Sequence, residues 1–448
     1  MTQPLDALTK SMLHAASSAG ADGADAVAIR GTSISVDVRG GTLEQAERAE
    51  GVDIGLRVFV GQRSSIVAAS DISSRTIEEM AVRAVAMAKA APEDAHAGLA
   101  APDQLAQDWD LAALELSDPT AEPAPEALQA DAARAEAAAL AIDGITQVQS
   151  ASAGYGTHEV QVSSSNGFEG AYARTSKGIS CVAIAGSGAE MERDYDGDSR
   201  VFQSDLRSAD EIGASAAMRA IRRLSPSKPP TGTFPVLFDE RISSSLIGHL
   251  LAAASGTAVA RGASWLRDSM GEQVLPEGLS LLEDPHRPRM SGSRPFDAEG
   301  LPTAKRMIVE NGILKGWTLD LATARKLGLP PTGNAARGAA SGPSPANWNV
   351  ALTQSDESRD NLVARMGTGL LVTSMIGSTI NPNTGDYSRG AAGLWVENGE
   401  ITHAINECTI AGNLLEMLRS IEPANDARPY LSRVVPSLLV PGMTLAGA

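Results

Sequence analysis

The sequence predicts an α+β fold, with a mixed α/β N-terminal region and a β-rich C-terminal domain. Three observations predict it: runs of alternating apolar and polar residues typical of antiparallel strands, apolar residues at helical spacing beside them, and many short strand patterns after about residue 234. The chain of 448 residues is also longer than one ordinary core needs. We expect units at residues 1–92, 93–228 and 229–448.

The first unit is predicted to contain a helix, three antiparallel strands and a second helix. Apolar residues at helical spacing predict a first helix that Gly20 ends; they are Leu5, Leu8, Met12, Leu13 and Ala16. The alternating runs cover residues 34–38, 54–60 and 65–69. A second helix is expected from about Ser74, with Glu78 and Glu79 in its first turn, where the helix dipole favours carboxylates.

The second unit begins after a segment without clean periodicity. Residues 92–124 are rich in Pro, Ala and acidic residues, which indicates a linker or an irregular crossing segment. The helix PEALQADAARAEAAALAID follows, then strands that turn at Asn166-Gly167. A last helix is expected after Ser208, because Glu211 three residues later completes a capping box.

The third unit is predicted as a strand (VLFDE), a helix (ERISSSLIGHLLAAASG) ended by Gly256, and many short strands. Asn-Gly pairs predict hairpin turns at Asn311-Gly312 and Asn398-Gly399. The segments between the strands are rich in Gly, Pro, Ser and Asn. Loops of this kind on a β scaffold commonly carry function.

Charge and composition exclude several classes of protein. The formal net charge of −17 disfavours direct nucleic-acid binding, which depends on Lys and Arg displacing counterions. No apolar run reaches eighteen residues, and the start shows no secretory signal, so we expect no membrane partner and a cytoplasmic location. The two cysteines, Cys181 and Cys408, are expected to be reduced.

The histidines do not form a recognisable zinc motif. A zinc peptidase helix carries two imidazoles about one turn apart and a carboxylate next to the first. His158-Glu159 resembles half of such a motif, but Val162 and Ser163 occupy the positions of the second imidazole, and the segment alternates as a strand. No nucleophile elbow and no complete phosphate loop is present either.

One histidine lies within a strongly predicted helix. His249 follows Leu246 by three residues, which places it on the apolar face as a core or interface histidine. An alternative is an unrecognised site formed by His249, His403 and Cys408.

Several stretches, in order and over most of the chain, resemble the PmbA/TldD family, and specifically its PmbA (TldE) branch. They include ERAEGVDIGLRVFVGQR, FDERISSSLIGHLLAAASGTAVARGASWL, VENGILKGWTLDLATARKLGLPPTGNAAR, NPNTGDYSRGAAGLWVENGEI and the closing VPSLLVPGMTLAGA. The resemblance implies a two-part protein related to a peptidase whose TldD branch carries H-E-x-x-x-H on a helix and a late cysteine ligand. It places the corresponding positions of this chain at Ile247, Gly248 and Ala252, so we expect no metal site and no catalytic residue here.

The resemblance also implies a function and a partner. We expect a subunit of a TldD/TldE-like zinc metallopeptidase complex that degrades or processes unfolded and small peptides, with zinc held by a TldD-type partner; homodimers also occur in the family. Exposed strand edges are expected to bind peptide by main-chain hydrogen bonds. The expected peptide or interface contacts are Asn334, Arg337, Asn381, Tyr387 and Arg389. The alternatives are a non-proteolytic regulator of the gyrase-modulator type and an autonomous peptidase.

Overall fold

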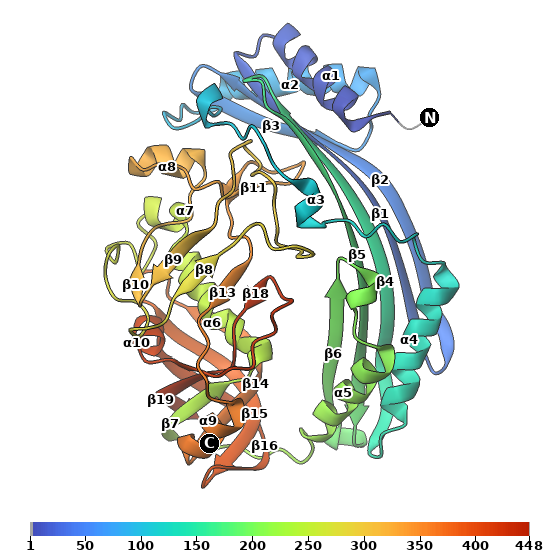
Figure 1. The fold of residues 1–448 in the computed structure, drawn as a ribbon, viewed down its shortest axis with the longest axis vertical. Helices are drawn as coiled ribbons and strands as arrows, with labels where there is room; N and C mark the ends of the chain where they lie inside the picture. The colour runs from blue at the N-terminus through green and yellow to red at the C-terminus, as the bar shows by residue number, and fades with distance from the viewer. Residues whose placement is uncertain (1–2, 448) are drawn as a thin grey trace.

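The protein consists of a long curved sheet and a β-rich part that faces one side of this sheet (Figure 1). The structure, a computed structural model, describes residues 3–447. Helices cover the opposite side of the sheet, and the chain beyond residue 229 builds the β-rich part. The predicted α+β class is confirmed.

Six antiparallel strands form the long sheet. In sequence they are β1 (Gly23–Arg39), β2 (Thr42–Val60), β3 (Arg63–Ala69), β4 (Ile145–Ser164), β5 (Glu169–Ala185) and β6 (Glu192–Arg200). Their order in space is β3-β2-β1-β4-β5-β6. The alternation of apolar residues sets the register; Ala26 of β1, for example, lies between Leu56 of β2 and Ser163 of β4.

Two pairs of helices bury their apolar sides on this sheet. At one end α1 (Leu5–Ser18) and α2 (Ser74–Ala90) pack against β1 to β3, and at the other α4 (Pro125–Leu140) and α5 (Ala209–Ile221) pack against β1, β4 and β5. The expected capping box of Ser208 and Glu211 is present on α5. The expectation for Glu78 and Glu79 was wrong: Ser73 caps α2, so both carboxylates lie one turn later.

The first two predicted units share the one sheet, because β1 pairs with β4 along fourteen residue pairs. Between them, residues 92–124 form the irregular crossing segment, with a 3-10 turn η1 (Pro102–Gln104) and a short helix α3 (Leu111–Leu114). This segment contacts both parts of the protein: Ala106 N donates to Gly300 O (2.8 Å), and Leu116 O accepts from Thr175 N (3.1 Å). The predicted boundary at residue 92 divides the sequence but not the sheet, and as a domain boundary it stays a prediction.

The β-rich part contains a closed six-stranded sheet. Its strands are β7 (Gly232–Phe238), β14 (Gly369–Ile380), β15 (Asp386–Glu397), β16 (Glu400–Asn413), β17 (Glu422–Pro423) and β19 (Leu438–Ala446). The order is β16-β15-β14-β7-β19-β17, and a further pairing of β16 with β19 closes it. Asn398 and Gly399 form the predicted hairpin turn with φ of 52° and 81°.

Helix α6 (Glu240–Ala253) follows β7 directly and packs into the largest core of the β-rich part. The prediction that Gly256 ends this helix was wrong. Helix α6 ends at Ala253, and Gly256 begins the short helix α7 (Gly256–Ala260). Gly256 is required there because a Cβ would lie 2.6 Å from the side chains of Leu319 and Thr323.

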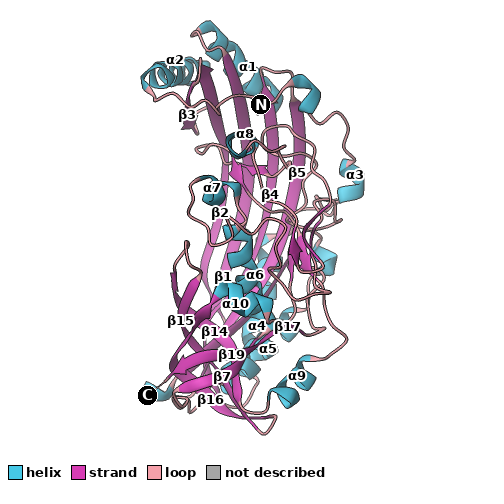
Figure 2. Cartoon of the chain, turned by 90° about the vertical axis from the view of Figure 1, so that its left-hand side faces the viewer, coloured by secondary structure: helices cyan, strands magenta, loops and turns pink. Residues whose placement is uncertain are grey.

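Short elements complete this part (Figure 2). They are β8 (Leu281–Glu283), β9 (Arg306–Glu310), β10 (Ile313–Leu314), β11 (Ala335–Ala336), β12 (Ser344–Pro345), β13 (Val350–Leu352), β18 (Arg433–Val434), α8 (Leu321–Leu327), α9 (Arg359–Met366) and α10 (Leu414–Arg419). Two 3-10 turns, η2 (Gly188–Glu190) and η3 (Gln203–Asp205), flank β6. None of the helices within residues 3–447 is long and apolar enough to cross a membrane.

Candidate functional site: a groove between the long sheet and helix α6

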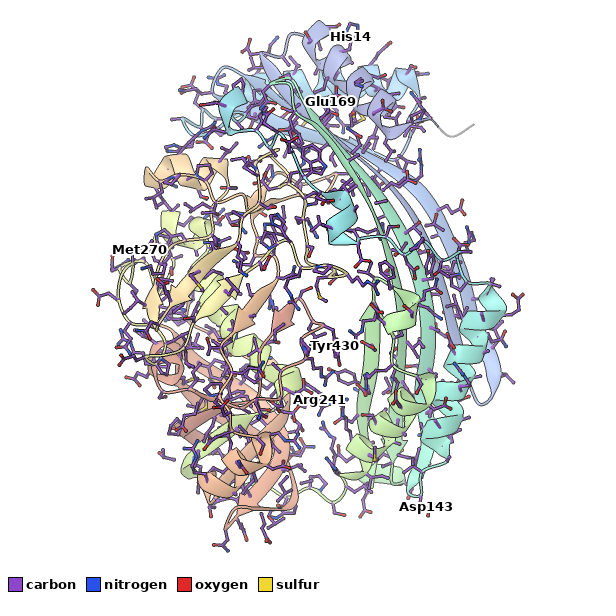
Figure 3. The ribbon with its side chains drawn as sticks, viewed as in Figure 1. His14, Asp143, Glu169, Arg241, Met270 and Tyr430 are labelled. Carbon is purple, nitrogen blue, oxygen red and sulfur yellow. The ribbon has the colours of Figure 1, made fainter. Side chains whose placement is uncertain are left out.

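A groove separates the inner side of the long sheet from the β-rich part. It contains two adjoining cavities of about 740 and 910 Å³, and Ser244 of α6 lines both. In Figure 3, Arg241 and Tyr430 lie on the side of the β-rich part that faces the sheet. The volume is sufficient for a peptide segment or a small molecule.

Small side chains form the sheet wall of the groove. The first cavity is lined there by Ser35, Ser152, Gly154, Ser176, Gly178, Ser180, Gly197 and Ser199. Because side chains alternate across a strand, the larger apolar residues of β5, such as Ile179 and Cys181, point to the helix side. The sequence pattern thus leaves room on the inner side.

The edge strand β6 is closed to a further strand by side chains. Tyr195 N donates to Asp194 Oδ1 (2.7 Å), and Arg219 donates to Tyr195 O (3.0 Å). Two residues further along β6, Arg207 donates to Gly197 O (3.0 Å). These contacts occupy main-chain groups on the outer edge, which protects it from pairing with another chain.

Asp196 anchors the two arginines that close this edge. Burial alone would raise the pKa of Asp196, but the hydrogen bond from Arg207 and the charges of Arg219 and Arg207 outweigh it and lower the pKa to about 2. The carboxylate therefore stays ionised at neutral pH. This cluster is a structural ion-pair network.

The opposite wall begins at the first turn of α6. Asp239 caps the helix by accepting from Arg241 N (3.2 Å). The Arg241 guanidinium donates to Asp239 (3.2 Å) and, across the groove, to Asp194 on β6 (3.0 Å). This buried contact fixes the distance between the two walls, and no local pattern predicts it because the two residues lie 47 positions apart in the chain.

Strand β14 presents an unpaired edge to the groove. It pairs with β7 only over Leu370 to Val372, whereas its pairing with β15 continues to Ile380. Beyond Val372, the residues from Thr373 to Ile376 line the larger cavity. Ile376 is 74% exposed. Main-chain groups on this side of β14 can accept an extended polypeptide.

The predicted contacts Tyr387 and Arg389 lie on β15, behind this edge. Tyr387 is buried, and its hydroxyl donates a hydrogen bond to Met375 Sδ (3.3 Å). Burial raises the pKa of Tyr387 to about 12. Arg389 lines the larger cavity, and its Nε donates to Gly377 O (2.7 Å).

Two buried polar atoms of α6 lie without a hydrogen-bond partner in the described structure: Ser245 Oγ and His249 Nε2. The His249 ring stands edge-on to the Tyr387 ring, with centroids 6.0 Å apart. Burial, and then the charge of Arg389, lowers the pKa of His249, so its imidazole is neutral at neutral pH.

The predicted zinc-helix positions are not grouped at the groove. Ile247 is fully buried in the core, Gly248 is half-buried near the Arg433 guanidinium, and Ala252 is exposed. On the same helix, Ser244 and Ser245 line the larger cavity, and the half-buried His249 follows Ser245 by four residues, which is also the H-E-x-x-x-H spacing.

The donor set along α6 does not fit a zinc site, because hydroxyls stand where the first imidazole and the carboxylate are needed. Within residues 3–447 no group of three or more His, Cys, Asp and Glu side chains is arranged to hold a metal ion. In the sequence S-S-L-I-G-H, the polar residues Ser244, Ser245 and His249 interrupt an apolar helix. This interruption is the sequence signal that could have identified them.

The other predicted contacts lie elsewhere. The Asn334 amide is buried and donates to Glu283 Oε1 (3.0 Å), and the buried Arg337 forms an ion pair with Asp25 of β1. Asn381 is exposed in the turn between β14 and β15, where its Oδ1 accepts from Asn383 N. Of the five, only Arg389 lines the groove, and the buried Tyr387 lies on the same strand; a role in peptide binding stays a prediction for all.

The alternative histidine–cysteine site is not a cluster. His403 contacts the Thr402 hydroxyl at the surface of β16 (2.9 Å). Cys408 is buried, its thiol donates to Ala391 O (3.2 Å), and burial raises its pKa to about 11. A protonated, buried thiol is neither a good metal ligand nor a good nucleophile.

Three family models match nearly the whole chain. They describe PmbA/TldA metallopeptidase domain 1 (residues 24–88), the central domain (118–224) and the C-terminal domain (231–447). The chain is 38% identical to the metalloprotease PmbA of Escherichia coli, over 95% of this chain and 92% of that one. It is 36% identical to the metalloprotease PmbA homolog of Haemophilus influenzae, over 96% and 94%.

Solved structures share the fold over the full length. A Bacteroides thetaiotaomicron protein described as a candidate modulator of DNA gyrase superposes with a TM-score of 0.91 at 26% identity, over 99% of both chains. TldE from Thermococcus kodakarensis superposes with a TM-score of 0.84 at 21% identity, over 98% of this chain and 100% of that one. The second likeness shows the fold alone.

Proposed function

The chain belongs to the PmbA/TldD metallopeptidase family, and from this premise we propose that it is a PmbA/TldE-type subunit that binds unfolded or small peptides and acts with a TldD-type zinc peptidase. The groove between the long sheet and α6 is the peptide-binding surface. The partner supplies the metal, and this chain helps to enclose the peptide.

The open edge of β14 is the observation that carries the proposal. Main-chain hydrogen bonds to a strand edge bind an extended chain with little regard to its sequence. Exposed apolar side chains line the same cavity: Ile376 (74% exposed), Tyr195 (57%) and Met191 (47%). An unfolded peptide offers both the main chain and the apolar side chains that such a surface accepts.

The side chains of α6 support a partner that holds the zinc. With one imidazole and two serines at the H-E-x-x-x-H spacing, this helix cannot supply the ligands and the base that activate a zinc-bound water. A homodimer is the other assembly the family suggests. The two buried free cysteines agree with the reducing cytoplasm as the place of action.

A reconstitution experiment tests the proposal. The chain, a TldD-type partner and their mixture are each incubated with a labelled unfolded peptide, and the zinc content of each chain is measured. We expect chelator-sensitive cleavage from the mixture, about one zinc per partner and none on this chain. Cleavage by this chain alone, with bound zinc, would refute the subunit role.

A variant in the groove links cleavage to the proposed surface. Ile376→Asp removes an apolar contact worth about 1.5–3 kcal/mol when fully buried, so peptide cleavage by the mixture should fall roughly tenfold or more. Leu43→Asp is the matched control, because Leu43 is also exposed (47%) but lies on β2, outside the groove lining. Equal activity of both variants would place peptide binding elsewhere.

A further inference from the structure

Arg389 carries a charge that no acidic group of the described structure neutralises. None of the ion pairs among the described residues includes Arg389, and its Nε donates to Gly377 O (2.7 Å). The acids of the same cavity are engaged by other arginines: Asp194 with Arg241 (3.0 Å) and Glu192 with Arg223 (3.5 Å). In a chain of net charge −17, an unpaired guanidinium in a groove is a specific feature.

The groups around Arg389 favour an anion. The His249 and Tyr387 rings stand edge to face with centroids 6.0 Å apart, and the Arg389 charge acts to lower the pKa of both groups. Ser245 Oγ, on the same side of α6, lacks a hydrogen-bond partner in the described structure and can donate. None of these side chains brings a negative charge at neutral pH. The site therefore offers donors and a positive charge, while the acids of the cavity are paired with other arginines.

The bond to Gly377 O positions the guanidinium at the end of the open β14 edge. A peptide that pairs with Thr373 to Ile376 would bring its end toward Arg389, and the bond to Gly377 O uses only the Nε donor of the guanidinium. A guanidinium binds a carboxylate through two parallel hydrogen bonds, which gives both strength and direction.

We propose that Arg389 forms a subsite for the free C-terminal carboxylate of a peptide bound along β14. The subsite rests on the proposed function, because it presupposes a peptide in the groove. With this subsite, the subunit selectively binds peptide fragments that have a free C-terminus.

Binding of three matched peptides to the full chain tests this inference. One labelled unfolded peptide is made with a free C-terminal carboxylate, with a C-terminal amide, and with a C-terminal aspartic acid amide, and Kd is measured by fluorescence anisotropy. We expect the free acid to bind about tenfold tighter than either amide. Arg389→Gln should remove this difference, and Arg389→Lys should leave roughly a threefold preference, since Lys keeps the charge but loses the paired donors.

Arg193→Gln is the matched control. Arg193 lines the same cavity from the sheet wall, and its guanidinium already bonds to Gln149 (3.0 Å), so this variant should keep the tenfold preference. Thermal unfolding of Arg389→Gln and Arg389→Lys checks that both variants fold.

The outcomes separate the two proposals. Equal binding of the free acid and the plain amide, or of the free acid and the aspartic acid amide, overturns the terminal subsite while peptide binding itself survives. Absence of binding for all three peptides overturns the proposed function.

Discussion

At the scale of single residues, Asp25 is a buried carboxylate that contacts one arginine from each part of the protein. It lies on β1, is buried, and accepts from Arg57 Nε (2.7 Å) and from Arg337 of the β-rich part. Burial alone would raise the pKa of Asp25, but the charges and hydrogen bonds of both arginines keep it below its ordinary value. The carboxylate is therefore the counterion of two buried cations.

Removing this carboxylate should destabilise the protein strongly. Asp25→Ala leaves the buried Arg337 without its counterion and Arg57 with only Glu299 (3.7 Å), and we expect a loss of about 3–5 kcal/mol in urea unfolding followed by circular dichroism. Glu159→Ala is the control; it breaks the partly exposed pair with Arg30, for which less than about 1 kcal/mol is expected. A similar small loss for Asp25→Ala would show that the buried cluster adds no stability.

The arginines also show what could not be predicted for single residues. Arg337 and Arg389 both follow Gly- and Asn-rich segments, and local sequence does not distinguish them. Asp25, the partner of Arg337, lies 312 residues away in the chain. Only the tertiary contact shows that Arg337 is neutralised and that Arg389 is not.

At the scale of elements, strands and turns followed from the sequence where their signals are local. Alternation located β1, β2 and β3, and the Asn-Gly pairs located the turns of three hairpins, because the side-chain period and positive φ are properties of a few adjacent residues. The sequence did not show that β14 extends beyond its pairing with β7, or that side chains close the edge of β6. Those features depend on which strand lies next to which.

A close contact between two helices gives a test at this scale. Gly213 of α5 packs against α4, where an added Cβ would lie 2.0 Å from Ala135 O. Helix propensity alone predicts that Gly213→Ala stabilises by about 1 kcal/mol. We expect the opposite sign, a loss of about 1–3 kcal/mol, because the helices must move apart.

The free energy of unfolding of Gly213→Ala decides between the two signs. Gly51→Ala on β2 is a suitable control, since a Cβ there meets no atom within 4 Å. Stabilisation by Gly213→Ala would mean that α4 and α5 are packed less closely than the structure shows.

At the scale of the whole molecule, many contacts hold the sheet and the β-rich part on either side of the groove, and two of the places are charged. One is the ion pair of Asp194 and Arg241. The other combines the charged cluster at Asp25 with aromatic rings packed edge to face, where the ring centroids of Trp109 and Phe168 lie 4.9 and 5.0 Å from that of Phe296. The groove is thus a property of the assembled molecule, and no single segment could predict it.

The charged cluster should make the stability of the molecule depend on pH. Glu299, in the β-rich part, is buried beside Arg57 of β2 (3.7 Å) and accepts from Leu321 N (2.8 Å). Burial raises the pKa of Glu299 to about 8, with the charges of Asp297 and Asp320 acting in the same direction against the charge of Arg57. In the unfolded chain the pKa is about 4.3.

Because the folded pKa is the higher one, the stabilising contribution of Glu299 is complete below about pH 4 and is lost as the pH rises through 8. Glu299→Gln keeps an acceptor for Leu321 N and cannot ionise. From pH 5 to pH 9, we expect the wild type to lose on the order of 2–4 kcal/mol relative to this variant, measured by urea unfolding at each pH. Asp297, whose pKa burial raises to about 6, is present in both proteins, so the difference isolates Glu299. If the difference in unfolding free energy between the two proteins stays constant with pH, Glu299 is ionised in the folded protein. Arg57 would then neutralise both Glu299 and Asp25.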